Sequence, residues 1–271
     1  MRIHILLCLG LAMMTALTAH AYQLRFAGAE GDMRTLAGTV STTAPKDDGS
    51  KDIEKSTASL SIREQVRAVT GGSATVERTF SMVMKDRTED ILGIHYTALR
   101  TLLGEISQMV LKPKIGDMMH MPVLKADSAV IDSFGTTLML PKDDVKIGDT
   151  WQAKGATQFV IDPTQILNGS YEITYKLIGV KDIDGKQCLQ IVGSYTLSMP
   201  RQKIMAIQDD TSETNATFTG STTFYFNAVA GAVQGMDINF SVKVKVFDGT
   251  TIKVDGALTM KGELRPVVTR L

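Results

Sequence analysis

The stretch from Met236 to Val246, MDINFSVKVKV, decides the fold class of this chain. Apolar and polar side chains alternate along it without a break. In an extended strand this period of two puts apolar side chains on one face and polar side chains on the other, which is typical of an antiparallel sheet with one buried face. The apolar set is Met236, Ile238, Phe240, Val242, Val244 and Val246, and the polar set is Asp237, Asn239, Ser241, Lys243 and Lys245.

The same alternation recurs in residues 58–68, 76–84, 171–177 and 189–199. Strands that follow one another in this way form a barrel or pack as two sheets. We therefore predict a mainly β fold whose antiparallel sheets form an open or closed barrel, and the choice between one barrel and two sheet domains stays open. In residues 58–68 the apolar face carries Ala58, Leu60, Ile62, Val66 and Ala68. Pairs that suit tight turns between strands are Gly71-Gly72, Asp184-Gly185, Asp248-Gly249 and Asp255-Gly256.

One segment has helical spacing instead. Asp86 followed by Glu89 suits a helix start, and Pro113 would end the helix. We predict one amphipathic helix near residues 89–109 that covers an open face of the sheet, although Gly104 lowers its propensity. The apolar positions that recur at this spacing are Leu92, Leu99, Leu102, Leu103, Ile106 and Met109.

The first 21 residues have the pattern of a secretory signal peptide. Arg2 precedes an apolar run that is too short to span a bilayer, and Ala19-His20-Ala21 suits signal peptidase. We therefore predict an exported protein, periplasmic or extracellular, that starts at Tyr22. Its domain plan would be a signal peptide at 1–21, an N-terminal β-rich half with the helix at 22–140 and a similar C-terminal half at 141–271.

Composition excludes some classes of function. The whole chain has 29 basic and 29 acidic residues, so it lacks the basic excess that nucleic-acid binding needs. Removing the signal peptide would leave Cys188 as the one cysteine, which precludes a disulfide within the chain. Cys188 lies in an alternating apolar run, and we interpret it as a buried, unreactive thiol.

Few residues suggest catalysis or metal binding. The string Met118-Met119-His120-Met121 could bind Cu(I), but the same methionines could equally fill a core edge. His95 and His120 are the histidines left after signal removal, and the usual hydrolase and phosphate-binding motifs are absent. We therefore predict no enzyme activity, no cofactor and no resident metal, with a hydrolase-type enzyme as the least favoured alternative.

An apolar-ligand site is the more specific possibility. Methionine and phenylalanine on one face of a strand adapt to varied apolar ligands. Its predicted lining would be Phe80, Met82 and Met84 on the strand, Leu99 and Leu103 on the helix, and Trp151, the single tryptophan.

The string LPKDDVKIGDTW at residues 140–151, after an opening YQLRF at Tyr22–Phe26, resembles a family of exported bacterial β-rich proteins of uncharacterised function. A later Gly-x-x-x-Phe strand, here Gly220–Phe224, belongs to the same resemblance. The resemblance implies a β-rich exported fold and carries no catalytic or binding residues. Strands wrapped round an apolar helix are also similar, at the level of fold alone, to LolA-type envelope lipoprotein carriers.

Two functions follow from these patterns. The first is a non-enzymatic envelope protein that acts in protein interaction or structure, through exposed sheet edges or the loop 44–56. The alternative is a carrier of an apolar ligand, a lipid or a lipidated peptide, held in a β-sheet cavity. In either case we expect a ligand or an envelope protein as partner, no nucleic acid and no integral membrane segment after signal cleavage.

Overall fold

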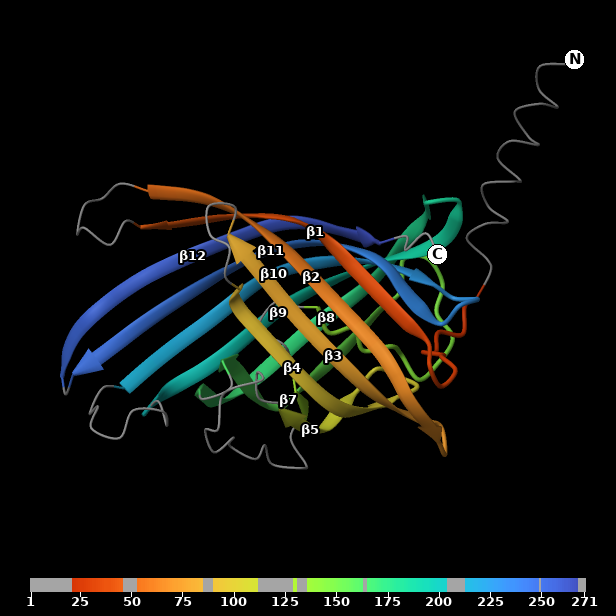
Figure 1. The fold of residues 1–271 in the computed structure, drawn as a ribbon, viewed down its shortest axis with the longest axis horizontal. Helices are drawn as coiled ribbons and strands as arrows, with labels where there is room; N and C mark the ends of the chain where they lie inside the picture. The colour runs from red at the N-terminus through yellow and green to blue at the C-terminus, as the bar shows by residue number, and fades with distance from the viewer. Residues whose placement is uncertain are drawn as a thin grey trace, which may run out of the picture.

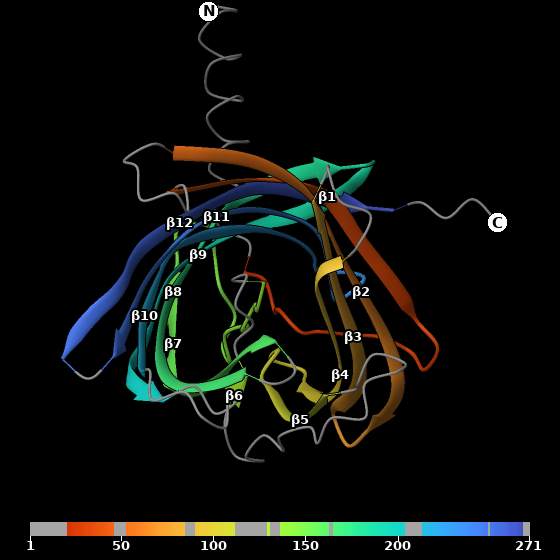
Figure 2. The same ribbon diagram turned by 60° about the vertical axis from the view of Figure 1, so that its left-hand side comes forward.

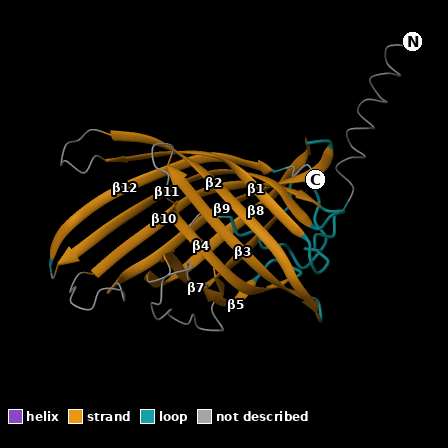
Figure 3. Ribbon diagram, in the orientation of Figure 1, coloured by secondary structure: helices purple, strands orange, loops and turns teal. Residues whose placement is uncertain are grey.

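The structure is a computed structural model that describes residues 21–45, 53–84, 90–111, 129–130, 136–162, 165–203, 213–248 and 250–267. The described residues form strands and connecting turns, with no helix among them (Figure 3). The strands are β1 (Met33–Pro45), β2 (Ile53–Thr70), β3 (Ser73–Met84), β4 (Asp90–Thr101), β5 (Ile106–Leu111), β6 (Ala129–Val130), β7 (Thr150–Asp162), β8 (Gln165–Ile183), β9 (Lys186–Lys203), β10 (Glu213–Asn227), β11 (Ala232–Asp248) and β12 (Thr251–Pro266).

All twelve strands belong to one sheet in the order β5-β4-β3-β2-β1-β12-β11-β10-β9-β8-β7-β6. Every ladder is antiparallel except the short parallel pairing of β6 with β7. β1 and β12, the first and last of the described strands, are neighbours in the middle of the sheet. The prediction of a mainly β antiparallel fold is confirmed. The sheet is open, because no ladder joins β5 to β6 in the described part. Both predicted halves contribute strands to this single sheet.

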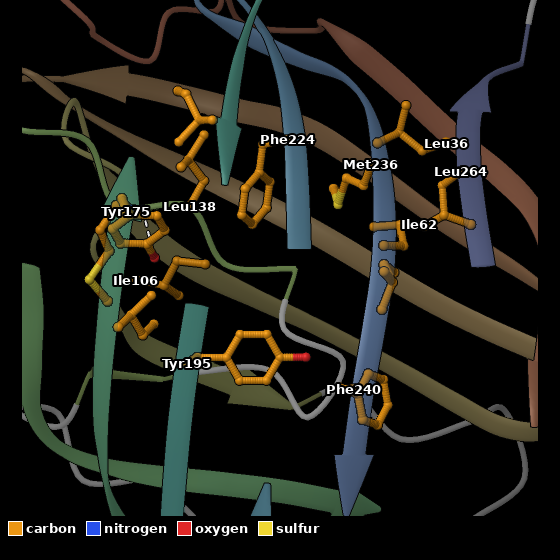
Figure 4. Packing of buried hydrophobic residues seen from close by; sticks show 14 of the residues in the cluster. Leu36, Ile62, Ile106, Leu138, Tyr175, Tyr195, Phe224, Met236, Phe240 and Leu264 are labelled. Atoms are coloured by element: carbon orange, nitrogen blue, oxygen red, sulfur yellow. Dashed lines mark hydrogen bonds between the residues drawn. The ribbon is translucent and has the colours of Figure 1, made fainter. Parts of the chain in front are cut away.

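The sheet is strongly curved, so that its two outer ends approach each other (Figures 1 and 2). The predicted apolar faces line the concave side. In β11, Met236, Ile238 and Phe240 are buried, as the alternation predicts. Figure 4 shows buried side chains of this core from strands far apart in sequence, among them Tyr175 of β8 and Leu264 of β12. The sheet therefore wraps its own core.

Close strand approach at the centre of the sheet depends on a glycine. A Cβ placed on Gly38 of β1 would lie 1.7 Å from the backbone oxygen of Glu263 in β12. Gly38 is paired with Leu264 on one side and with Leu60 on the other. A side chain at this position would therefore push two paired strands apart.

Two non-strand segments pack against the turns at one end of the sheet. In the first segment, residues 21–32, Phe26 N donates a hydrogen bond to Leu102 O (2.8 Å) and Ala27 N donates one to Gly231 O (2.9 Å). In the second segment, residues 136–149, Leu140 N donates a hydrogen bond to Leu103 O (2.7 Å). The two segments meet at an isolated bridge between Tyr22 and Val145. They bury Leu24, Phe26, Leu138, Met139 and Leu140 against the core.

The predicted helix at 89–109 is wrong. The segment forms β4 and β5, with a tight turn between them at Leu102–Gly104. Gly104 takes φ +87°, and a Cβ there would lie 2.2 Å from Leu138 O, so this glycine marks a crowded turn. In β4, Tyr96 and Ala98 face the core as alternate residues. The apolar residues at helical spacing are divided between β4, the turn and β5, where they are Ile106 and Met109.

The turn predictions have mixed outcomes. Gly71-Gly72 and Asp184-Gly185 are turns, with φ between +51° and +81° at all four residues, as predicted. The turn predicted at Asp255-Gly256 is wrong, because both residues lie inside β12. Of the other predicted features, residues 1–20 of the signal peptide, the Met118–Met121 string, residues 46–52 of the loop and Gly249 lie outside the described residues.

Candidate functional site

The two outer ends of the sheet, β4 and β5 at one end and β6 and β7 at the other, come together at a boundary that we call the seam. The short strand β6 pairs with β7 at Thr157 and Gln158. Residues 150–156 of β7 have no strand partner on that side in the described part of the chain. A cleft of about 820 Å³ lies beside this edge, a volume in the range of small-molecule and peptide sites. Its lining includes Leu103, Glu105, Met139, Lys142, Trp151 and Lys154.

Trp151 anchors the floor of the cleft. Its ring stacks on Tyr175 (5.5 Å between centroids, 21° between planes) and its Nε1–H donates to Met139 O (2.8 Å). Tyr175 is fully buried, and its hydroxyl donates to Thr137 O (3.0 Å). The two rings therefore hold the segment 136–141 against β7 and β8. This segment forms one wall of the cleft, and contacts with buried residues keep that wall in place.

The hydrogen-bond pattern of β7 shows which backbone groups face the cleft. Gly148 N donates to Leu177 O (2.7 Å) and Leu177 N donates to Asp149 O (3.1 Å), so Gly148 and Asp149 form a bulge opposite Leu177 and Asp149 takes the hydrogen-bonded position. Because hydrogen-bonded positions alternate along an antiparallel ladder, Trp151 and Ala153 bond to β8. The backbone N–H and C=O groups of Thr150, Gln152 and Lys154 then point away from β8, toward the open edge. The edge presents several donors and acceptors in strand geometry.

The rim of the cleft is charged with both signs. Glu105, Asp143 and Asp149 contribute carboxylates, and Lys142 and Lys154 contribute ammonium groups. Tyr171 also lines the cleft, and burial together with the nearby negative charge of Glu105 raises the pKa of its phenol. Its hydroxyl lies 4.0 Å from Met139 Sδ. The site thus combines an aromatic floor, a strand edge and a polar rim.

The structure brings two of the six predicted ligand residues together, since Trp151 and Leu103 line this cleft. Phe80 and Met82 lie on β3: Phe80 is buried and stacks on Tyr96, and Met82 packs against the same core. Met84 ends β3, paired with Ala58. Leu99 alternates with the buried Ala98 and Arg100, which places it on the opposite, convex face of the sheet.

Sequence reasoning missed a buried charge cluster. Arg34, Glu64 and Arg78 are cross-strand neighbours on β1, β2 and β3. Arg78 Nε donates to Glu64 Oε2 (2.8 Å), and Arg100 of β4 donates to Glu64 Oε1. A signal was present, because the alternation puts Glu64 on the same face as Ile62 and Val66 and so predicts a carboxylate inside the core.

The remaining candidate residues have structural partners. His95 lies on the convex face, where its Nε2 is 2.5 Å from Glu77 Oε1. Cys188 is buried, as predicted, and burial raises the pKa of its thiol. Within the described ranges, no group of three or more His, Cys, Asp or Glu side chains is placed to hold a metal ion. Those ranges also contain no helix with the length and apolar character to cross a bilayer.

Comparison with known proteins does not add to this geometry. Neither the protein-family models nor the curated proteins contain a match for this sequence. The resemblance carried by residues 140–151 stays a prediction, and the seam cleft is the feature from which a function can be proposed.

Proposed function

We propose that this protein is a non-enzymatic exported interaction protein that binds an extended polypeptide segment at the seam. The observation that carries the proposal is the edge of β7 at residues 150–156, which has no strand partner on that side among the described residues and borders a cleft of about 820 Å³. A peptide that adds a strand to such an edge gains main-chain hydrogen bonds, and neighbouring pockets select its side chains.

The composition of the cleft supports a peptide over a purely apolar ligand. Trp151 and Leu103 offer apolar contact, whereas Glu105, Lys142 and Lys154 offer charge at the rim. Interfaces for polypeptides commonly combine an aromatic centre with a polar rim.

The concave face gives less support to the carrier alternative. Side chains that would line a lipid cavity, such as Phe80, Leu60 and Met199, have relative accessible areas of 0–1 %. Side chains with so little exposed area have no room for a water molecule beside them, so these residues are packed core.

The test is photo-crosslinking in the producing cell. A photoreactive residue replaces Lys154 in the cleft or, as a control, the exposed Ser59 on the convex face of β2. We expect one polypeptide adduct from the Lys154 probe and none from the Ser59 probe. An adduct that is a lipid would favour the carrier alternative.

Two variants at Gln152 make the test specific for strand addition. Gln152→Pro removes an N–H that points to the open edge, whereas Gln152→Ala keeps it. We expect the adduct at position 154 to be lost with Gln152→Pro and kept with Gln152→Ala. An adduct that survives Gln152→Pro would overturn strand addition at β7.

A further inference from the structure

A small cavity lies beside the buried charge cluster, apart from the seam. Its volume is about 40 Å³. Four charged side chains line it, Arg34, Glu64, Arg78 and Arg100, with apolar walls that include Phe26 and Val233. Glu64 is the one acidic side chain among the lining residues.

Glu64 is ionised and fully engaged. Burial opposes its ionisation, but the charges and hydrogen bonds of Arg78 and Arg100 lower its pKa to about 2. Each carboxylate oxygen accepts from one of the two arginines. Both carboxylate oxygens therefore have hydrogen-bond donors, and Glu64 acts on Arg34 through its charge alone.

Arg100 has donor capacity left over. Its side chain is 4 % exposed and its guanidinium lies over the Phe26 ring, 4.6 Å from the centroid. Its Nε–H is buried and has no acceptor among the described residues. A buried donor without an acceptor is destabilising, more so when it is charged, so an acceptor in the cavity would stabilise it.

Arg34 faces the same cavity and is loosely held. Its Nη2 lies 3.5 Å from both Ala27 O and Ala230 O, and 4.0 Å from Asp32 Oδ2. Burial lowers the pKa of Arg34. The negative charge of Glu64 opposes this shift, and the positive charge of Arg100 adds to it. The two guanidinium groups repel each other across a space that an anion would fill.

Arg34 also connects this cavity to the surface. It lines an outer cleft of about 390 Å³, together with Lys186. Leu36 and Val233 line both spaces as well. An anion that enters from solvent would meet Lys186 and Arg34 before it reaches Arg100.

We propose that the cavity between Arg34 and Arg100 is a binding site for one small monovalent inorganic anion of chloride size. The anion accepts charge-assisted hydrogen bonds from Arg100 Nε and from the Arg34 guanidinium. Since one water needs roughly 10–15 Å³ of such space, about 40 Å³ accommodates a halide and excludes larger organic anions. This site is independent of the peptide proposed at the seam.

Thermal unfolding provides the first test. The full mature chain is unfolded in increasing sodium chloride and, for comparison, in sodium gluconate of equal ionic strength. We expect a saturable rise in Tm with chloride, because an anion that binds the folded state alone stabilises it by mass action. Arg34→Gln should weaken the apparent chloride affinity by about tenfold. The control Arg201→Gln, at a surface ion pair with Glu213, should leave it unchanged.

Crystals grown in sodium bromide provide the second test, which needs no variant. We expect an anomalous peak between Arg34 and Arg100. Equal Tm values in the two salts, or bromide peaks confined to the protein surface, would overturn the proposal and assign the cavity to water. If Arg34→Gln does not fold, the bromide position in the wild-type crystal still decides the question.

Discussion

The centre of the sheet and its seam differ in how completely their strands are paired. At the centre, β12, β1, β2 and β3 each bond to two neighbours over most of their length. At the seam, β6 contributes two residues, and residues 150–154 of β7 line a cleft. The centre therefore holds the residues that decide stability, whereas the seam leaves strand edge available for a partner. Substitutions in the two regions should separate folding from binding.

The largest expected effect is at the centre, at the buried carboxylate. Glu64→Gln removes the negative charge between Arg78 and Arg100 and should lower the free energy of unfolding by about 3–5 kcal/mol. Chemical denaturation measures it. Glu263→Gln, an exposed carboxylate on β12, is the matched control and should change little. Equal losses from the two variants would contradict a special role for the buried cluster.

The same carboxylate predicts a pH dependence. The pKa of Glu64 is about 2 in the folded protein against an ordinary 4.5. Its contribution is therefore complete above about pH 4.5 and is lost as pH falls through about 2, by roughly 3 kcal/mol in all. Urea unfolding between these limits should show the deficit of Glu64→Gln shrinking as pH falls. A deficit that stays constant with pH would show that the pKa of Glu64 is not depressed in the folded state.

The next largest effect is expected from a substitution that tests the close approach of β1 and β12. Gly38→Ala places a Cβ against the Glu263 backbone and should cost about 2–3 kcal/mol. Gly179 in β8 has open space for 4 Å around the point where a Cβ would lie, and no positive φ. Gly179→Ala is therefore the matched control, with an expected change within about 0.5 kcal/mol. Thermal or denaturant unfolding compares the two variants, and similar stabilities would contradict the close approach of β1 and β12.

At the seam, Trp151→Phe keeps a ring over Tyr175 but removes the Nε1–H bond to Met139 O. We expect a loss of about 1–2 kcal/mol in denaturant unfolding. Tyr171→Phe loses only a 4.0 Å contact with Met139 Sδ and should change stability by less than about 0.5 kcal/mol. If both variants were neutral, the wall formed by residues 136–141 would be held by other contacts.

The smallest effect on stability should come from Gln152→Pro, which removes an N–H on an open edge. We expect about 0.5 kcal/mol or less, alongside the loss of the crosslinked partner. Thr39→Pro in β1, where both sides are paired, should prevent cooperative unfolding because a ladder bond is lost inside the sheet. Circular dichroism during heating separates the two cases. A comparable loss at Gln152 would mean that its N–H is bonded within the folded chain.

Much of the fold was predictable because period-two alternation is a local property. Met236–Val246 and residues 58–68 both form strands with the predicted face inward. The segment 89–109 was not predictable in the same way, since the apolar residues of β4, of the Leu102–Gly104 turn and of β5 together imitate a helical period. Sheet order was also beyond local pattern, because nothing in β1 or β12 indicates that they pair.

The candidate site was predictable in part. Trp151 stood out as a large residue at a strand start, and it does line the cleft. The nearby Glu105, Lys142 and Lys154 did not stand out, because isolated charged residues are usually solvated, and the structure alone brings them to one edge. Glu64 could have been found by asking why a carboxylate lies between Ile62 and Val66 on an apolar face.

The adjacency of β1 and β12 has a consequence for the order of folding. Val40 near the start of the chain pairs with Gly262 near its end, so the central ladder has very high contact order and closes late. Until β12 has been synthesised, both β1 and β11 expose a full edge to other chains. The polypeptide should therefore lack its cooperative core, and be prone to aggregate, until β12 is available to pair with β1 and β11.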